Sequence, residues 1–261
     1  MSVWDTYKNR VTIFGDTKRE ASLNKTKYTL KHKLADSLSY QTVIINGETR
    51  EAIIDDSDNF NEKIMHSMPG DDFSCGDVVD WSDNHWLITE KDANAIIRTK
   101  VKLVQCNYLL KWIDSEHIIH EQWCVIEDGT KYLVGEYEDR AFMTTRGDSR
   151  IAMFIGRNED TKKFTREHRF LIDDVDYAEM HAYILTKPLK VGRTYNNQGI
   201  YAFVLQESVS TDNDNFELGI PDYYLHFPKS PNKPPSTIDS VESITGNKGD
   251  LEDHGGKKVW L

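Results

Sequence analysis

Apolar and polar residues alternate along most of this chain, as in β-strands with one face in solvent, and most clearly between residues 70 and 107. Val78–Trp81 and Trp86–Thr89 are short, β-branched and aromatic, and the turn residues Ser82–His85 between them predict a hairpin. Ala95–Cys106 then alternates again and predicts a third strand. Three strands with one face in solvent and the other apolar predict the core of a small antiparallel barrel or sheet.

Further strands are predicted on both sides of this centre. Asn46-Gly47 supplies the two positive-φ residues of a type I′ turn, so Tyr40–Ile45 and Glu48–Ile54 should form a hairpin. From residue 108 onward, short strands alternate with polar turns, and this spacing predicts an all-β sandwich or barrel rather than βαβ units. The candidate strands are Tyr108–Ile113, Ile118–Ile126, Lys131–Glu138, Arg140–Thr145, Ser149–Gly156, Arg169–Ile172, Met180–Thr186 and Gly199–Glu207.

The two ends of the chain have a different pattern. The first residues predict a short amphipathic helix, to about Arg10, that buries Trp4 and Tyr7, whereas residues 16–36 show no clean periodicity. Four prolines between Pro228 and Pro235 indicate an extended linker. We therefore expect a mainly β protein: a β-barrel domain over 1–107, a second β-sandwich or barrel domain over 108–226, and a Pro-rich linker with an extended tail over 227–261.

Charge and composition narrow the functional classes. The 261 residues carry a formal net charge of −11. A chain this acidic is poorly suited to general nucleic-acid binding, which needs clustered Lys and Arg, but it suits the wall of a channel through which DNA must slide. The apolar runs are too short for a membrane span. Three cysteines without a C-x-x-C spacing, and no secretion signal, predict reduced thiols made in a cytoplasm.

No motif for catalysis or metal binding stands out. His117-Ile118-Ile119-His120 lies in a predicted strand, so surface or half-buried histidines are favoured over a metal site. The segments 56–60 and 212–216 begin like calcium loops, but Phe stands at the fifth position and no glycine follows, which favours solvated turns. Arg146-Gly147-Asp148 is ordinary turn chemistry. We therefore predict no enzyme, no cofactor and no tightly bound metal.

The tryptophans are the best candidates for interaction. Four of them lie in predicted strands, and we expect most of these to be core residues: Trp81, Trp86, Trp112 and Trp123. Trp4 and Trp260 lie near the two ends of the chain, where segments rarely complete their own core, and are expected to dock on neighbouring molecules. For the tail we expect Val259-Trp260-Leu261 to be the anchor, with a strand added to a neighbour's sheet edge.

One resemblance to a known family runs through most of the chain. It is carried by Met1–Tyr7, Asp36–Tyr40, Pro69–Asp72, Trp86–Asn94, Leu103–Trp112, Glu121–Cys124, Tyr137–Arg140, Thr145–Arg150 and Tyr195–Asn197. With these stretches, residues 1–226 resemble structural proteins encoded among the head genes of tailed phages and prophages of Gram-positive bacteria. The hairpin from Gly76–Val79 to Trp86–Ile88 is similar to that of head-closure, or stopper, proteins.

The resemblance implies a head-to-tail connector. Such a protein forms a homo-oligomeric ring, expected here as a hexamer or dodecamer, between the portal or adaptor and the tail. DNA passes through the ring without specific binding, no membrane is involved, and the protein resides in the virion neck after assembly in the host cytoplasm. The loops with Asp71-Asp72 and Lys91-Asp92-Ala93-Asn94 are the predicted ring or channel contacts. The alternative is a tail or capsid surface module that binds cell-wall carbohydrate through aromatic side chains, and a wall hydrolase is a distant third.

Overall fold

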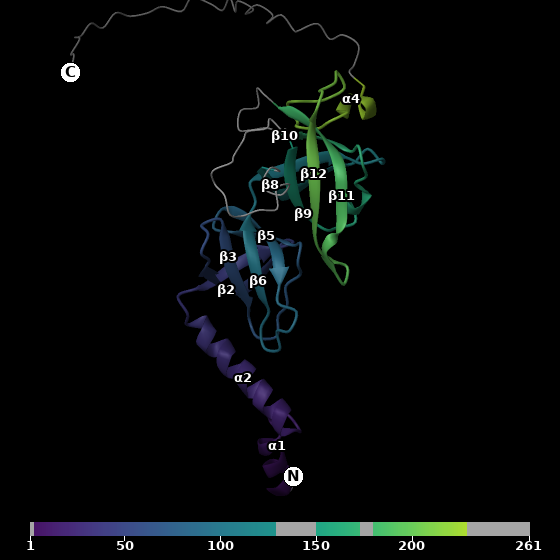
Figure 1. Ribbon diagram of the computed structural model, residues 1–261. Helices are drawn as coiled ribbons and strands as arrows, with labels where there is room; N and C mark the ends of the chain where they lie inside the picture. Colours follow the sequence, from purple (N-terminus) through teal and green to yellow (C-terminus); the bar gives the residue numbers. More distant parts are fainter. Residues whose placement is uncertain (1–2, 129–149, 173–179, 229–261) are drawn as a thin grey trace, which may run out of the picture. The chain divides into compact units, whose positions relative to one another are not determined.

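The computed structural model describes residues 3–128, 150–172 and 180–228 (Figure 1). The predicted strands Lys131–Glu138 and Arg140–Thr145, and the predicted anchor Val259–Leu261, lie outside this part of the chain. Residues Met1–Phe227 form one unit and Pro228–Leu261 a second. The first unit is mainly β, as predicted, and contains a closed barrel and a six-stranded sheet.

The first six strands close into an antiparallel barrel in the order β1-β2-β3-β6-β5-β4. The Asn46-Gly47 turn between β1 and β2 has positive φ at both residues, as predicted. The strand predicted over Ala95–Cys106 begins only at Lys100, because the segment before it forms an irregular loop. The strands are β1 (Tyr40–Ile45), β2 (Glu48–Asp56), β3 (Glu62–Ser67), β4 (Val78–Trp81), β5 (Asn84–Lys91) and β6 (Lys100–Gln105).

The second half of the chain forms an antiparallel sheet in the order β10-β11-β12-β9-β8-β7. Its core contains Phe164, Phe170 and Phe203, which are almost fully buried. Leu110 and Trp112 from β7 also belong to this core. The strands are β7 (Tyr108–Ile113), β8 (Ile119–Asp128), β9 (Arg150–Gly156), β10 (Arg169–Ile172), β11 (His181–Tyr195) and β12 (Gln198–Ser208).

A third apolar cluster joins the barrel to the sheet, with Leu87 from the barrel packed against residues of the sheet. Three glycines meet at this junction. A Cβ on Gly156 would collide with the Gly76 carbonyl oxygen, and a Cβ on Gly76 would collide with the Gly199 carbonyl oxygen. The Gly199 N–H donates to the Cys75 carbonyl oxygen at 2.8 Å, so backbone meets backbone directly.

The helices depart most from the sequence-based expectations. The predicted N-terminal helix is α1 (Val3–Val11), but Trp4 and Tyr7 are 71% and 59% exposed, so their predicted burial is wrong. The longer α2 (Lys18–Ala35) was not predicted; Thr17 caps it by accepting the Glu20 N–H at 3.2 Å. A 3₁₀ turn, η1 (Thr161–Lys163), and the short α4 (Tyr223–His226) complete the described helices. None of the helices in the described ranges is long and apolar enough to cross a membrane.

All three cysteines are free thiols. Cys106 and Cys124 are buried and Cys75 is half-buried. Burial raises the pKa of Cys75 to about 11 and that of Cys106 to about 12, because a thiolate is poorly solvated there.

Candidate functional site

The structure brings three of the predicted interface residues together at one end of the barrel. Asp71, Asp72 and Asp92 line an open pocket of about 270 Å³, and Asn94 lies in the same loop as Asp92. Basic residues line this pocket too: Lys27 from α2, together with Lys91 and Arg98. The pocket thus combines both signs of charge.

Within this pocket, Asp72 is fixed by the chain itself. Its carboxylate accepts hydrogen bonds from Lys91 Nζ at 2.8 Å and from Thr99 Oγ1 at 2.6 Å. Partial burial raises the pKa of Asp72, but the bonds from Lys91 and Thr99 outweigh it, and the pKa lies below its usual value. Asp92 Oδ1 accepts the Asn94 N–H at 3.0 Å, which shapes the loop. Asp72 therefore links the loop before β4 to Lys91 and Thr99 of the same chain. Its contact with a neighbouring subunit stays a prediction.

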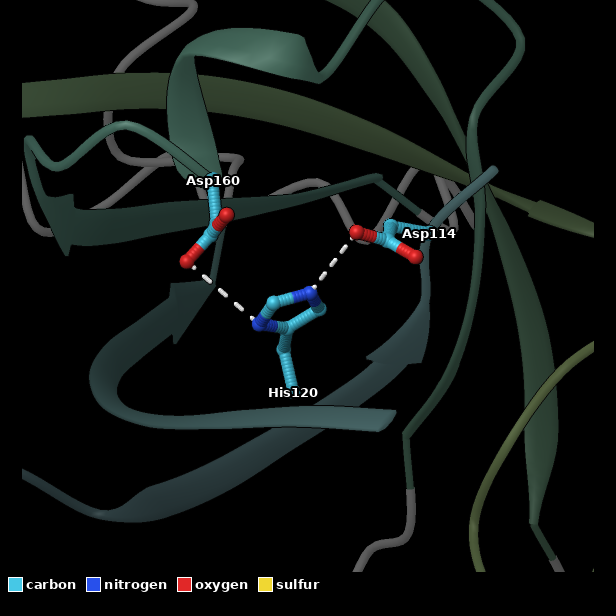
Figure 2. Close-up of side chains that lie close together, drawn as sticks. All are labelled: Asp114, His120 and Asp160. Atoms are coloured by element: carbon cyan, nitrogen blue, oxygen red, sulfur yellow. Dashed lines mark hydrogen bonds and ion pairs between the residues drawn. The ribbon is translucent and has the colours of Figure 1, made fainter. Parts of the chain in front are cut away.

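A second cluster, around His120, was missed by the sequence analysis (Figure 2). Asp114 follows β7, His120 belongs to β8, and Asp160 precedes η1. His120 Nε2 lies 3.0 Å from Asp114 Oδ2, and its Nδ1 lies 3.4 Å from Asp160 Oδ2. The imidazole also stacks on the buried Trp112 ring, with 5.5 Å between ring centroids. His120 therefore bridges two carboxylates while packed on an indole.

Asp114 is the best-satisfied carboxylate of this bridge. Its side chain is only 5% exposed, and its Oδ1 accepts the N–H groups of Glu116 and Ile118 at 2.8 and 3.0 Å. The hydrogen bond with His120 and the one from the Ile118 N–H hold the pKa of Asp114 well below its usual range. Lys163 Nζ lies 3.4 Å from Asp114 Oδ2 and 3.3 Å from Asp160 Oδ1. The two carboxylates thus already face two basic side chains.

Asp114, His120 and Asp160 are residue types that bind metals, and one ligand atom from each lies within 4.8 Å of the others. The orientation of the imidazole argues against a metal centre, because each ring nitrogen is directed at a different carboxylate and one metal can bind only one nitrogen. The Lys163 ammonium group also lies close to both carboxylates. The residues fit a carboxylate–imidazole–carboxylate bridge that ties η1 to the β7–β8 hairpin. His117, by contrast, contacts His226, with 2.8 Å between their Nδ1 atoms.

The second calcium-like segment, 212–216, was predicted to be a solvated turn, and this prediction is wrong for Asp214. Its carboxylate is also not available as a calcium ligand. The Asp214 side chain is fully buried and is held by the Arg169 guanidinium at 2.7 and 3.0 Å. The same guanidinium reaches Asp222 Oδ1 at 2.5 Å. This two-pronged ion pair fixes the loop after β12 against β10. In the first segment, Asp56 pairs with Lys63 at 2.6 Å in an exposed position.

The tryptophans in the strands serve mainly as core residues, as predicted. Trp86 and Trp112 are 4% and 2% exposed. Trp81 is half-buried and packs against Trp86, and the half-buried Trp123 stacks on His85 with 4.0 Å between centroids. Within the described ranges these four do not form an exposed coplanar platform of the kind that binds sugars.

Comparisons with known proteins give one family match. Residues 7–105 match the family model described as the YomX N-terminal domain, which spans most of α1, α2 and the barrel. A YomX-like domain indicates a phage-related protein. Among curated proteins no sequence matches this chain.

One solved structure is similar, described as MrkH, a novel c-di-GMP dependence transcription regulatory factor. It is 10% identical, and the similarity covers 72% of this chain and 86% of that one with a TM-score of 0.22. A likeness this weak carries no argument about fold or ligand.

Proposed function

We propose that this protein is a structural virion protein of a tailed bacteriophage. In this proposal it forms the homo-oligomeric head-closure, or stopper, ring that joins the portal or adaptor to the tail around the DNA channel. The observation that carries the proposal is the match of residues 7–105 to a phage-related domain, in a chain whose sequence resembles head-gene proteins.

The exposed apolar side chains support an assembled protein. Val3 and Trp4 on α1 are 87% and 71% exposed, and Ile13 before α2 is 72% exposed. Phe60 and Ile96 in barrel loops are also largely exposed. Large apolar side chains concentrated on an arm and on loops are typical of surfaces that other subunits cover. The net charge of −11 suits a wall along which DNA slides.

The described titratable clusters also fit a structural role better than a catalytic one. His120 lies between two carboxylates, Asp72 is latched by Lys91, and Asp214 is held by Arg169. Each of these acids is already paired with a basic side chain inside the protein. A glycosidase needs instead two carboxyl groups facing a substrate, one of them raised in pKa. We therefore propose that the protein is not an enzyme.

The test is loss of the gene in the phage or prophage that encodes it, with the full-length gene supplied from a plasmid as the control. We expect heads that package DNA and then lose it, together with unattached tails, because the closing ring is missing. Complete particles that fail to adsorb would favour the carbohydrate-binding module instead. Complete and infectious particles would overturn both functions. A map of intact particles should place the protein as a ring beneath the portal.

A further inference from the structure

The helix α2 carries a charge opposite to that of the rest of the protein. Its 18 residues contain six Lys and Arg and a single acid, Glu20, a formal net charge of +5 in a chain of −11. In the part of the chain that the structure describes, none of these six basic side chains is paired with a carboxylate. Such a helix attracts an acidic partner and repels a second copy of itself.

The same helix has an apolar stripe that the fold leaves partly uncovered. No residue of α2 is buried, and Leu23, Leu30 and Leu34 are only half-buried along one side. An isolated helix of this length is marginally stable in water, so its apolar side is expected to find further cover. Next to this stripe, an open groove of about 610 Å³ is lined by Lys18, Arg19, Ser22, Leu23, Thr26 and Ile97. The groove has apolar walls and a basic rim.

The loop between β2 and β3 offers the complementary chemistry. Phe60 in this loop is 95% exposed, so it contacts almost nothing within its own chain. Residues 51–62 contain five acids and no Lys or Arg. Asp56 and Glu62 pair with Lys63 and Lys102 from neighbouring strands, whereas Asp58, two residues before Phe60, is exposed. A protruding phenylalanine fits an apolar groove, and the acidic residue near it is complementary in charge to the basic rim of that groove.

We propose that α2 of one copy binds the β2–β3 loop of a second copy, with Phe60 inserted into the groove between Leu23 and Ile97. Lys18 and Arg19 then face the acids around Asp58. The groove and the loop are different surfaces, so the contact is head-to-tail and closes into a ring when the rotation between subunits allows. The inference deepens the proposed function by naming the contact between ring subunits, and it rests on the ring proposed there.

Two other partners fit less well. A second α2 is disfavoured because two helices of +5 repel each other. Duplex DNA is disfavoured because the Lys and Arg residues are spread over more than one face of α2, with Lys25 and Lys27 on nearly opposite sides. DNA would also leave the leucine stripe uncovered.

The first test is self-association of the purified full chain, measured by sedimentation. We expect Phe60→Ser and Arg19→Glu each to weaken association about tenfold or more, and Asp58→Lys to restore it in the Arg19→Glu background. Tyr195→Ser is the matched control, because Tyr195 is an exposed aromatic residue at the end of β11, outside this contact. Urea unfolding should show that Phe60→Ser leaves the fold intact, since the side chain is in solvent within one chain.

The second test is disulfide trapping between copies. Ser22→Cys and Asn59→Cys variants, mixed under a mild oxidant, should yield a cross-linked dimer containing one of each. Association unchanged by Phe60→Ser, absence of this mixed dimer, or a wild-type protein that stays monomeric would each overturn the contact. Salt-sensitive duplex binding abolished by Arg19→Glu, with association unchanged, would assign α2 to nucleic acid. None of these results decides the connector role, which the phage gene loss tests separately.

Discussion

The half-buried His168 packs against the phenylalanine-rich core of the sheet, with 4.8 Å between its ring centroid and that of Phe164 and 4.9 Å to that of Phe170. Burial lowers the pKa of His168 to about 4, because the charged imidazolium is poorly solvated there. Between pH 6.5 and 4 the unfolded chain binds a proton at this residue that the folded chain does not. Stability should therefore fall as pH drops through this window, by up to about 3 kcal/mol.

The His168→Phe variant tests this assignment. Urea unfolding at several pH values between 4 and 7 should show a flatter stability profile than the wild type, because the titrating ring is gone. His181→Gln serves as the control, since the side chain of His181 is half exposed and pairs with Glu207. An equally steep profile in His168→Phe would assign the acid sensitivity to other groups.

The bridge around His120 predicts a second stability effect. Asp114→Ala should lower the midpoint of urea unfolding more than Asp114→Asn does, because the amide oxygen can still accept the Glu116 and Ile118 N–H groups. The pKa of Asp114 is lowered by folding, so its contribution is present above pH 3.8 and is lost as pH falls below that value. Equal midpoints for the two variants would contradict this role.

A metal at the same cluster is expected to be absent. Elemental analysis of the native protein should show no stoichiometric zinc or calcium, and a chelator should leave the melting temperature unchanged. The reason is that His120 and Lys163 already face the two carboxylates. Stoichiometric metal that disappears in Asp114→Ala would refute the bridge and establish a metal centre.

At the scale of elements, local sequence predicts the strands well and the helical arm poorly. Hairpins such as β1–β2 follow from a turn signal and alternation, which depend on neighbouring residues only. The helix α2 lacks such a signal because it buries no residue and Lys27 interrupts its leucine stripe. A helix without a clear apolar face shows no clear period.

The candidate sites show the same difference between residues that are close in sequence and residues that only the fold brings together. Asp71 and Asp72 were predicted from a loop in sequence, and the structure places them with Asp92 in one pocket. The His120 bridge could not be found in this way, because Asp114 reads as a turn residue and Asp160 lies 40 positions after His120. Only the pairing of β7 with β8, and the packing of η1 beside them, brings these side chains together.

The glycine junction between barrel and sheet gives a prediction for whole elements. Gly156→Ala should destabilise the protein by at least about 2 kcal/mol, because the new Cβ would collide with the Gly76 carbonyl oxygen and backbone cannot yield easily. Urea unfolding measures the loss. Gly192→Ala is the matched control: its Cβ would meet only the flexible Leu189 side chain, 3.2 Å away. A similar loss in the free energy of unfolding for both variants would contradict the requirement for glycine at the junction.

At the scale of the whole molecule, the net charge opposes binding to duplex DNA. We expect the full chain not to bind duplex DNA at physiological salt, because its net charge of −11 repels phosphates and outweighs α2. Fluorescence anisotropy of a labelled duplex, titrated with protein at several salt concentrations, checks this. Tight, salt-dependent binding by the wild type would contradict a channel wall along which DNA slides.

The three thiols have a consequence for durability outside the cell. With its pKa raised to about 11, Cys75 is a thiolate in fewer than about one molecule in a thousand at neutral pH, and Cys106 in fewer still. Since the thiolate is the form that oxidants attack, oxidation of Cys75 and Cys106 by air should be slow in the folded protein. In the connector proposed above, this would let a protein made under reducing conditions last under oxidising ones while the virion waits for a host.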